Sequence, residues 1–342
     1  MMKGRDIIFT VILIIAIAVT PIYSCPNMIN KSQKKTVNSI IDGVSTDEIH
    51  FAIQPSCAFI PLYVAKEKGW VDEVMAEYGV KVYWHSFDAG PAINASMLKC
   101  ESDIGVLGDV PAVFAIGLGQ ENTVIATAAQ AADSYAVLVP ADSDITCAED
   151  LKGRRFATVI GTTPHNMMNK FLKSGGLTMD DVTFVNINAK DVESVLKEHR
   201  ADAVAIWEPS VTRFVDSGIA KILGVGSDCD LAGTNVLVAR SEFVKENPEL
   251  VAAVCDLYRR GAEELANGTD DVTINNIAEY MKLDREQLRS LIPKFNYSVD
   301  IVKEDTDSLN DTIDFLYTVN QLPRKYDIND HIYVDGLQHE DE

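Results

Sequence analysis

Cysteine is scarce in this sequence, and it is spread out. The chain has six cysteines among 342 residues, and no two of them form a C-x-x-C pair. Zinc sites and disulfide-stapled domains use closely spaced cysteines, so neither a metal site nor a disulfide framework is expected. One bridge, Cys147 to Cys229, would suit an oxidising compartment, but the sequence does not establish that these two residues are close.

Catalytic signatures are also missing. The sequence has no G-x-S-x-G elbow, no P-loop, no G-x-G-x-x-G after a strand and no H-E-x-x-H. Gly224 and Gly226 belong to a short loop-like G-x-G, and the adjacent Asp180 and Asp181 are typical of solvated helix caps. The chain is therefore not expected to be an enzyme, and no cofactor is expected.

Positive charge is in deficit. Asp and Glu total 51 and Lys and Arg total 30, which gives a formal net charge of -21. Proteins that bind nucleic acid need a basic surface to displace the counterions of the phosphate backbone. Nucleic acid is therefore not an expected partner.

The one long apolar run lies at the N-terminus, where residues 7–19 (IIFTVILIIAIAV) follow Lys3 and Arg5. The run is shorter than the roughly 20 residues that span a bilayer, which favours a signal peptide at residues 1–24. An uncleaved anchor extended through Pro21 and Ile22 is the alternative. We therefore expect an exported protein held at the outer face of the cell membrane.

A candidate lipid attachment site follows that run. Residues 22–25 (IYSC) resemble a lipobox with Cys25 as the lipidated residue, although Tyr23 departs from the pattern. Residues 25–47 are polar and show no sustained hydrophobic period, as in a flexible tether. The expected order is an export segment, a lipid anchor and a tether ahead of the folded part.

The folded part begins near Glu48 and reads as an α/β protein. Strand-like runs such as IHFAI, KVYWHSF and DIGVLG alternate with helical ones, which predicts parallel βαβ units. The same alternation returns over residues 154–207, which we interpret as a second lobe. From Ser241 onward the chain is mostly helical.

Proline follows the ends of three strand-like runs. Gly90 precedes Pro91, Asp109 and Val110 precede Pro111, and Thr162 and Thr163 precede Pro164. Proline is favoured in the first turn of a helix. Helix N-termini gathered at the carboxyl ends of parallel strands form an anion-binding cleft without Lys or Arg. The sequence therefore predicts a cleft for a small anion.

Some residues near these turns allow two interpretations. Asp109 could cap its own helix or accept a hydrogen bond from a cationic part of the ligand. Trp207 could be a buried residue beside a cap or a ligand wall, with Glu208 meeting a ligand amine. His165 could donate to an anion or lie on a helix surface.

The ordered segments resemble a known family. GWVDEVMAEYGVKVYWHSFDAGPAINASMLKCESDIGVLGDVPAVFA, DLKGRRFATVIGTTPHNMM, DDVTFVNI and ADAVAIWEP are similar to the nitrate, taurine and aliphatic-sulfonate periplasmic binding proteins, over about Ile49 to Glu242. The resemblance implies a type II periplasmic-binding fold, with lobe 1 at 48–138 plus 236–342 and lobe 2 at 139–235. YAVLVP and NVLVAR would be the crossover strands, and ligand would be held by hinge closure.

The resemblance also implies a function. The chain would be the monomeric solute-binding component of an ABC importer, passing a small anion or zwitterion to a permease and its ATPase. An exported enzyme on the same fold, acting on a small pyrimidine or carboxylate, is the alternative. The ligand contacts carried over by the matching motifs are Ser56, Cys57, Ala89, Gly90, Asp109, Gln130, Thr162, Thr163, Trp207 and Glu208.

Overall fold

The computed structural model describes residues 43–333. The expected export segment, Cys25 and most of the tether lie outside these residues. Within the described range, no helix is long and apolar enough to cross a membrane.

Two mixed β-sheets organise the described chain. The first has six strands in the order β11-β4-β10-β3-β1-β2. Strand β1 is parallel to β2 and β3, whereas β10 is antiparallel to β3 and β4. Its strands are β1 (Glu48–Ile53), β2 (Lys81–Ser86), β3 (Ile104–Gly108), β4 (Asn122–Gln130), β10 (Thr234–Arg240) and β11 (Asn296–Tyr297).

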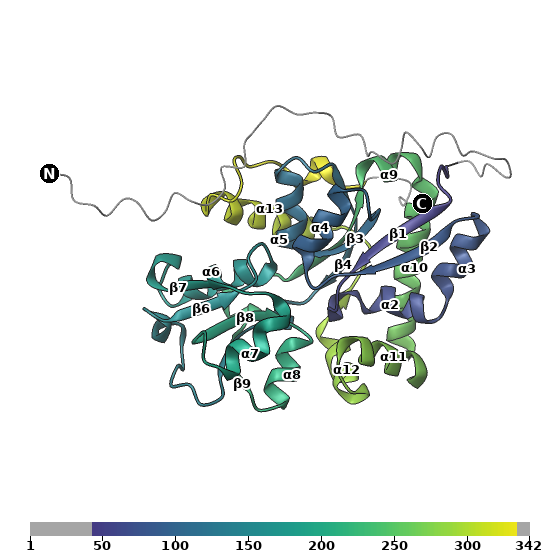
Figure 1. Ribbon diagram of the computed structural model, residues 1–342. Coiled ribbons are helices and arrows are strands. Elements are labelled where there is room, and N and C mark those ends of the chain that lie inside the picture. The colour runs from purple at the N-terminus through teal and green to yellow at the C-terminus, as the bar shows by residue number, and fades with distance from the viewer. Residues whose placement is uncertain (1–42, 334–342) are drawn as a thin grey trace. The chain divides into compact units, whose positions relative to one another are not determined.

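Helices cover both faces of the first sheet (Figure 1), with α4 and α5 on one side and α2, α3 and α10 on the other. The C-terminal segment adds helices to the same unit, as its sequence predicts. These helices are α2 (Ile60–Glu67), α3 (Trp70–Glu77), α4 (Gly90–Leu98), α5 (Asp109–Gly117), α9 (Ser241–Glu246), α10 (Pro248–Asn267), α11 (Asp271–Met281), α12 (Arg285–Leu291) and α13 (Lys303–Thr318).

The second sheet has five strands in the order β7-β6-β8-β5-β9. Strand β6 is parallel to β7 and β8, and β5 is antiparallel to β8 and β9. The elements are β5 (Tyr135–Pro140), β6 (Arg155–Thr158), β7 (Thr183–Asn186), β8 (Ala203–Trp207), β9 (Ala220–Val225), α6 (Thr163–Ser174), α7 (Val192–Lys197) and α8 (Ser210–Asp216). Each sheet carries its own cluster of buried apolar side chains.

The chain passes between the sheets twice. Residues 131–134 lead from β4 to β5, and residues 226–233 lead from β9 back to β10. The two passing segments touch, because the Ala131 N–H donates to the Gly233 carbonyl at 3.2 Å. The runs YAVLVP and NVLVAR directly follow these passages and lie in the second and first sheet respectively. Strand β9 has no counterpart among the sequence predictions.

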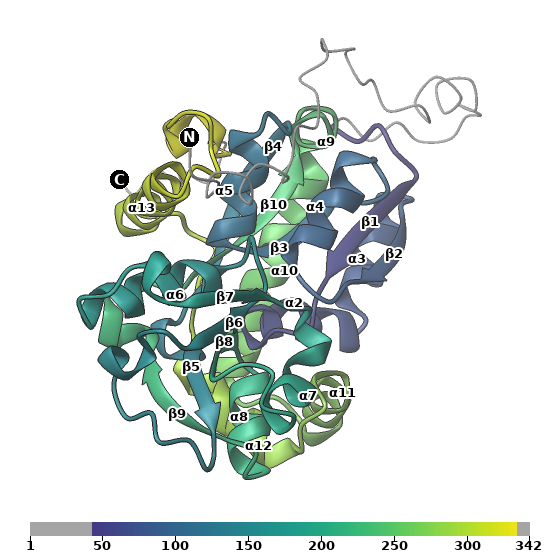
Figure 2. The same ribbon diagram turned by 60° about the vertical axis from the view of Figure 1, so that its left-hand side comes forward.

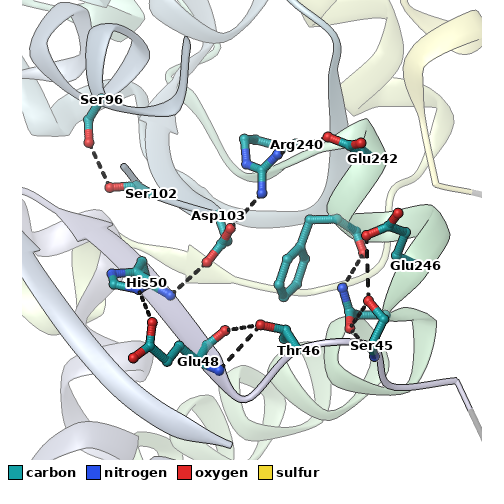
Figure 3. A network of polar contacts seen from close by, with 12 residues as sticks. Ser45, Thr46, Glu48, His50, Ser96, Ser102, Asp103, Arg240, Glu242 and Glu246 are labelled. Carbon is teal, nitrogen blue, oxygen red and sulfur yellow. Dashed lines mark hydrogen bonds and ion pairs between the residues drawn. The ribbon is translucent and has the colours of Figure 1, made fainter. Parts of the chain in front are cut away.

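The amino-terminal edge of the first sheet is held by a polar network (Figure 3). The Asp103 carboxylate accepts the backbone N–H of His50 at 2.9 Å and pairs with the Arg240 guanidinium at 2.8 Å. These contacts tie β1, β3 and β10 together at one end. The opposite end of the sheet, where β1, β2 and β3 have their carboxyl ends, faces the second sheet.

The cysteines in the described range include four free thiols, at Cys57, Cys147, Cys229 and Cys255. The pairing of Cys147 with Cys229 that we considered is therefore not formed. Cys147 is exposed and Cys229 is buried.

Candidate functional site

A cavity lies at the carboxyl ends of the strands, between the two sheets. Its volume is about 30 Å³. The first sheet and its helices contribute residues that follow β1, β2 and β3, and the second contributes the start of α6 and the end of β8. The lining residues are Gln54, Ser56, Phe59, Gly90, Gly108, Pro111, Tyr135, Thr162, Thr163, Pro164, Trp207 and Asn235. None of them is charged at neutral pH.

Two helices point their N-termini at this cavity, and both carry proline at the second position. In α4 the order is Gly90, Pro91, Ala92, and the Ala92 N–H donates to the Ala89 carbonyl at 3.1 Å. Pro91 has no N–H to offer. Within residues 43–333 the Gly90 N–H has no hydrogen-bond partner, so α4 offers the cavity one free backbone donor.

Helix α6 repeats the arrangement on the other side. The His165 N–H donates to the Thr162 carbonyl at 2.9 Å, and Pro164 again lacks a donor. The Thr163 N–H has no hydrogen-bond partner among the described residues. Two helix N-termini, one from each sheet, therefore present free N–H groups to the same small space, which favours an anion.

The hydroxyl groups of the cavity are not equivalent. The Thr162 hydroxyl donates to the Val159 carbonyl at 2.6 Å, and the Thr163 hydroxyl donates to Asp109. The Tyr135 hydroxyl donates to the Asn235 side-chain oxygen at 3.0 Å. Since a hydroxyl has one proton, these three groups have already used theirs.

Ser56 differs from the other hydroxyl residues. Its oxygen accepts the Ala58 N–H at 3.3 Å, so its own proton remains available. The turn that carries it is anchored from the C-terminal segment, because the Tyr297 hydroxyl donates to the Cys57 carbonyl at 2.8 Å. Ser56 is thus a fixed hydroxyl donor beside the two free backbone N–H groups.

The remaining wall is apolar. Phe59, Pro111, Pro164 and Trp207 surround the polar groups, and Trp207 is 9% exposed. A site with a few fixed donors among aromatic and proline surfaces suits a small anion with an apolar part.

Asp109 does not line the cavity. Its carboxylate accepts hydrogen bonds from the Val110 N–H at 2.7 Å, the Thr163 hydroxyl at 2.5 Å and the Thr312 hydroxyl at 2.6 Å. Burial raises the pKa of Asp109, and these bonds oppose that rise. The N-cap of α5 is Gly108, so Asp109 is the first residue of the helix and not its cap. Its carboxylate joins the first turn of α5 to α6 and α13.

Glu208 is likewise committed to protein groups. Its carboxylate accepts the Thr212 N–H at 2.9 Å and the Thr212 hydroxyl at 3.0 Å, and pairs with Lys294 at 3.1 Å. The Glu208 side chain is fully buried. The cation that pairs with Glu208 is therefore Lys294, from the segment after α12, and not a ligand amine.

Four further predicted residues lie beside the cavity without lining it. Gln130 donates to Asp305 at the start of α13, at 2.5 Å. Ala89 and Cys57 are buried next to the lining residues Gly90 and Ser56. His165 is buried between Phe184 and Phe315, and burial lowers its pKa to about 4. It is neutral near pH 7, so it is neither a surface histidine nor a cationic anion donor.

Sequence reasoning placed Ser56, Gly90, Thr162, Thr163 and Trp207 where the structure has a cavity. It missed Gln54, Phe59, Gly108, Pro111, Tyr135, Pro164 and Asn235. Tyr135 is the first residue of β5 and Asn235 the second of β10, the strands that follow the two passages between sheets, and that location could have signalled them. No group of three or more His, Cys, Asp or Glu side chains within residues 43–333 is arranged to hold a metal ion.

Comparison with known proteins identifies the family of this chain. Residues 56–271 match the model of the family described as NMT1/THI5 like. The chain belongs to that family. An aliphatic sulfonates-binding protein of Bacillus subtilis (strain 168) is 25% identical over 284 residues, covering 83% of this chain and 85% of its own.

Solved structures give the fold. The alkanesulfonate-binding protein SsuA from Xanthomonas axonopodis pv. citri, bound to MOPS, aligns with a TM-score of 0.77 at 20% identity, covering 85% of this chain and 99% of the other. The two sheets and two passages of this family member form the type II periplasmic-binding fold that the family resemblance implies.

An enzyme shares this fold as well. The desulfurization enzyme DSZB aligns with a TM-score of 0.63 at 17% identity, covering 85% of this chain and 97% of the other. Cys57 directly follows the lining residue Ser56. It is fully buried, and burial raises the pKa of its thiol well above the ordinary value. A thiol in that state is a poor nucleophile at neutral pH.

Proposed function

We propose that this protein is the extracytoplasmic solute-binding component of an ABC importer. It binds a small organic sulfonate, or an anion of similar shape, and releases it unchanged to a permease that an ATPase drives. The observation that carries the proposal is the uncharged cavity with free N–H groups at Gly90 and Thr163. Helix N-termini of this kind bind oxyanions without a cationic side chain.

The relatives support the same ligand class. The Bacillus subtilis protein is named for aliphatic sulfonates, and the structural neighbour from Xanthomonas is an alkanesulfonate-binding protein. A sulfonate has three oxygens to accept the N–H groups and the Ser56 hydroxyl, and its alkyl part would meet Phe59 and Trp207. Nitrate and taurine are the other ligands that the family resemblance implies.

We propose that capture works by closure. The unit built on the first sheet (48–130 and 234–333) and the unit built on the second sheet (135–225) would separate about the passages at 131–134 and 226–233 to admit the ligand. The cavity of about 30 Å³ is then the closed or nearly closed arrangement. Export and tethering through the N-terminal segment with Cys25 would place the monomeric receptor at the outer face of the membrane.

Thermal unfolding against a ligand panel tests the proposal. The panel is ethanesulfonate, longer alkanesulfonates, taurine, nitrate, bicarbonate and uracil. A ligand at a hundred times its dissociation constant stabilises the folded state by about 2.7 kcal/mol. We expect a shift with alkanesulfonates and recovery of the ligand unchanged after incubation. No shift with any sulfonate, or a chemically altered ligand, would refute the receptor assignment.

A further inference from the structure

Two carboxylates directly follow lining residues of the cavity, Asp109 after Gly108 and Glu208 after Trp207, and both are already compensated. Asp109 accepts three hydrogen bonds from its own helix and from two threonines. Glu208, which directly follows the lining residue Trp207, is bonded to Thr212 and paired with Lys294. No lining residue is acidic. A ligand ammonium group entering the cavity would therefore find no free carboxylate.

The pair between Glu208 and Lys294 joins the two lobes. Glu208 ends β8 in the second sheet, while Lys294 follows α12, whose Leu288 and Leu291 belong to the apolar core of the first sheet. Both charges act on Cys57: Glu208 raises the pKa of the thiol and Lys294 lowers it, after the larger effect of burial. The ion pair therefore lies beside the turn that carries Ser56.

We infer that Lys294 is a specificity-determining residue. Its ammonium group pairs with Glu208 and so takes the place that the ammonium group of a zwitterionic ligand would otherwise have. The site therefore selects amine-free sulfonates over taurine. This inference rests on the proposed sulfonate-binding function. The ammonium of an aminosulfonate would lose its hydration without gaining a partner, and removal of an ion from water into an apolar site without pairing is costly.

Removal of the lysine should reverse the preference. In Lys294→Met the stem of the side chain is kept, but the carboxylate of Glu208 loses its cation. With the lobes closed on the ligand, the unpaired carboxylate of Glu208, which directly follows the lining residue Trp207, is then available to a ligand ammonium. A site with a buried group left unpaired favours the ligand that satisfies it.

Three ligands separate charge from size. Ethanesulfonate, isethionate (2-hydroxyethanesulfonate) and taurine (2-aminoethanesulfonate) share the sulfonate and differ at carbon 2. The experiment is calorimetric titration of each into the purified full-length protein and into the Lys294→Met, Lys294→Arg and Glu208→Gln variants. Isethionate controls for polarity without charge, and Lys294→Arg keeps the positive charge.

We expect the wild type and Lys294→Arg to bind ethanesulfonate at least about tenfold more tightly than taurine. In Lys294→Met the ratio should fall by at least about fivefold or invert. Glu208→Gln removes the carboxylate and should continue to reject taurine. The ratio is the informative quantity, because a general loss of stability would weaken both ligands alike.

Other results would overturn the inference. Taurine binding as tightly as ethanesulfonate in the wild type would overturn it even if no variant folds. An unchanged ratio in a folded Lys294→Met would do the same. In both cases sulfonate binding itself, and hence the proposed function, would stand. If the wild type bound none of the three sulfonates, the proposed function and this inference would both be refuted.

Discussion

The hydroxyl of Thr163 donates to the carboxylate of Asp109 at 2.5 Å, and this bond links the N-terminus of α6 to that of α5. The same carboxylate accepts the Thr312 hydroxyl from α13. Figure 2 shows α13 beside α5, with α6 below both. A second contact follows the same path, since Lys170 on α6 pairs with Asp311 on α13 at 2.8 Å. Three helices from distant parts of the chain thus meet at one buried acid.

Asp109→Ala should destabilise the protein by about 2–4 kcal/mol, because three donors lose their common acceptor in a buried place. Urea unfolding followed by circular dichroism measures the loss. Asp109→Asn keeps one acceptor oxygen and should lose less. A loss below about 1 kcal/mol for Asp109→Ala would contradict the structural role given to this residue.

Gly108→Ala tests how closely the lobes approach. Gly108 has φ -70°, which alanine adopts without strain, yet a Cβ there would overlap the Thr163 hydroxyl oxygen. We expect ligand affinity to fall at least about tenfold, while the ligand-free melting temperature changes little, since the clash exists only when the lobes are together. Calorimetry with ethanesulfonate gives the affinity.

The double variant Gly108→Ala with Thr163→Ala is the matched control for that change. It removes the atom that the new methyl group would meet. Affinity should recover relative to Gly108→Ala alone, although the lost bond to Asp109 keeps it below wild type. No recovery would show that Gly108 acts through something other than this approach.

The Ser56 hydroxyl has a free proton and the Thr162 hydroxyl does not, so substitutions at the two positions should affect ligand binding differently. Ser56→Ala removes a donor that remains free, and loss of a hydrogen bond to a charged group should weaken sulfonate binding by roughly 10- to 100-fold. Thr162→Ala removes a hydroxyl that already donates to Val159, so stability should fall by about 1 kcal/mol with a smaller effect on affinity. Equal losses of affinity would argue against this distinction.

His165 predicts a pH dependence of stability. Burial lowers its pKa from 6.5 to about 4, so on acidification the unfolded chain takes up a proton before the folded chain does. The contribution of the neutral, buried His165 to the free energy of unfolding is fully present above about pH 6.5 and is lost as the pH falls toward 4. Between pH 7 and 5 it should amount to about 2 kcal/mol.

His165→Phe removes that titration and fits the contacts with Phe184 and Phe315. Unfolding free energies at pH 7 and pH 5 should therefore differ less in this variant than in the wild type. The same pH dependence in both proteins would show that other groups cause it.

Short sequence patterns predicted those residues of the candidate site whose position depends on neighbours in the sequence. Strand ends followed by proline located Gly90 and Thr163, because a proline in the first helical turn is a short-range signal. The same pattern explains why Asp109 was ambiguous: a residue near the start of a helix can cap or bind, whereas the partners of Asp109 include Thr312, 203 residues away.

The C-terminal helices explain most of the remaining differences. The sequence predicted helices there, but it could not show which side chains of this segment contact the residues around the cavity. Tyr297 donates a hydrogen bond to the turn that carries Ser56, Lys294 forms an ion pair with Glu208, and Asp305 accepts a hydrogen bond from Gln130. Each contact depends on how a whole helix docks, which is a property of the packed core and not of any short sequence segment.

The paired passages between the sheets limit how the protein can move. Ala131 and Gly233 are joined by a backbone hydrogen bond, and a Cβ on Gly233 would lie 2.6 Å from the Ala131 carbonyl oxygen. Two chain segments held this tightly side by side bend together and resist twisting about each other. If the lobes separate as proposed, they do so along essentially one mechanical coordinate, and each reclosure returns Gly90 and Thr163 to the same relative position.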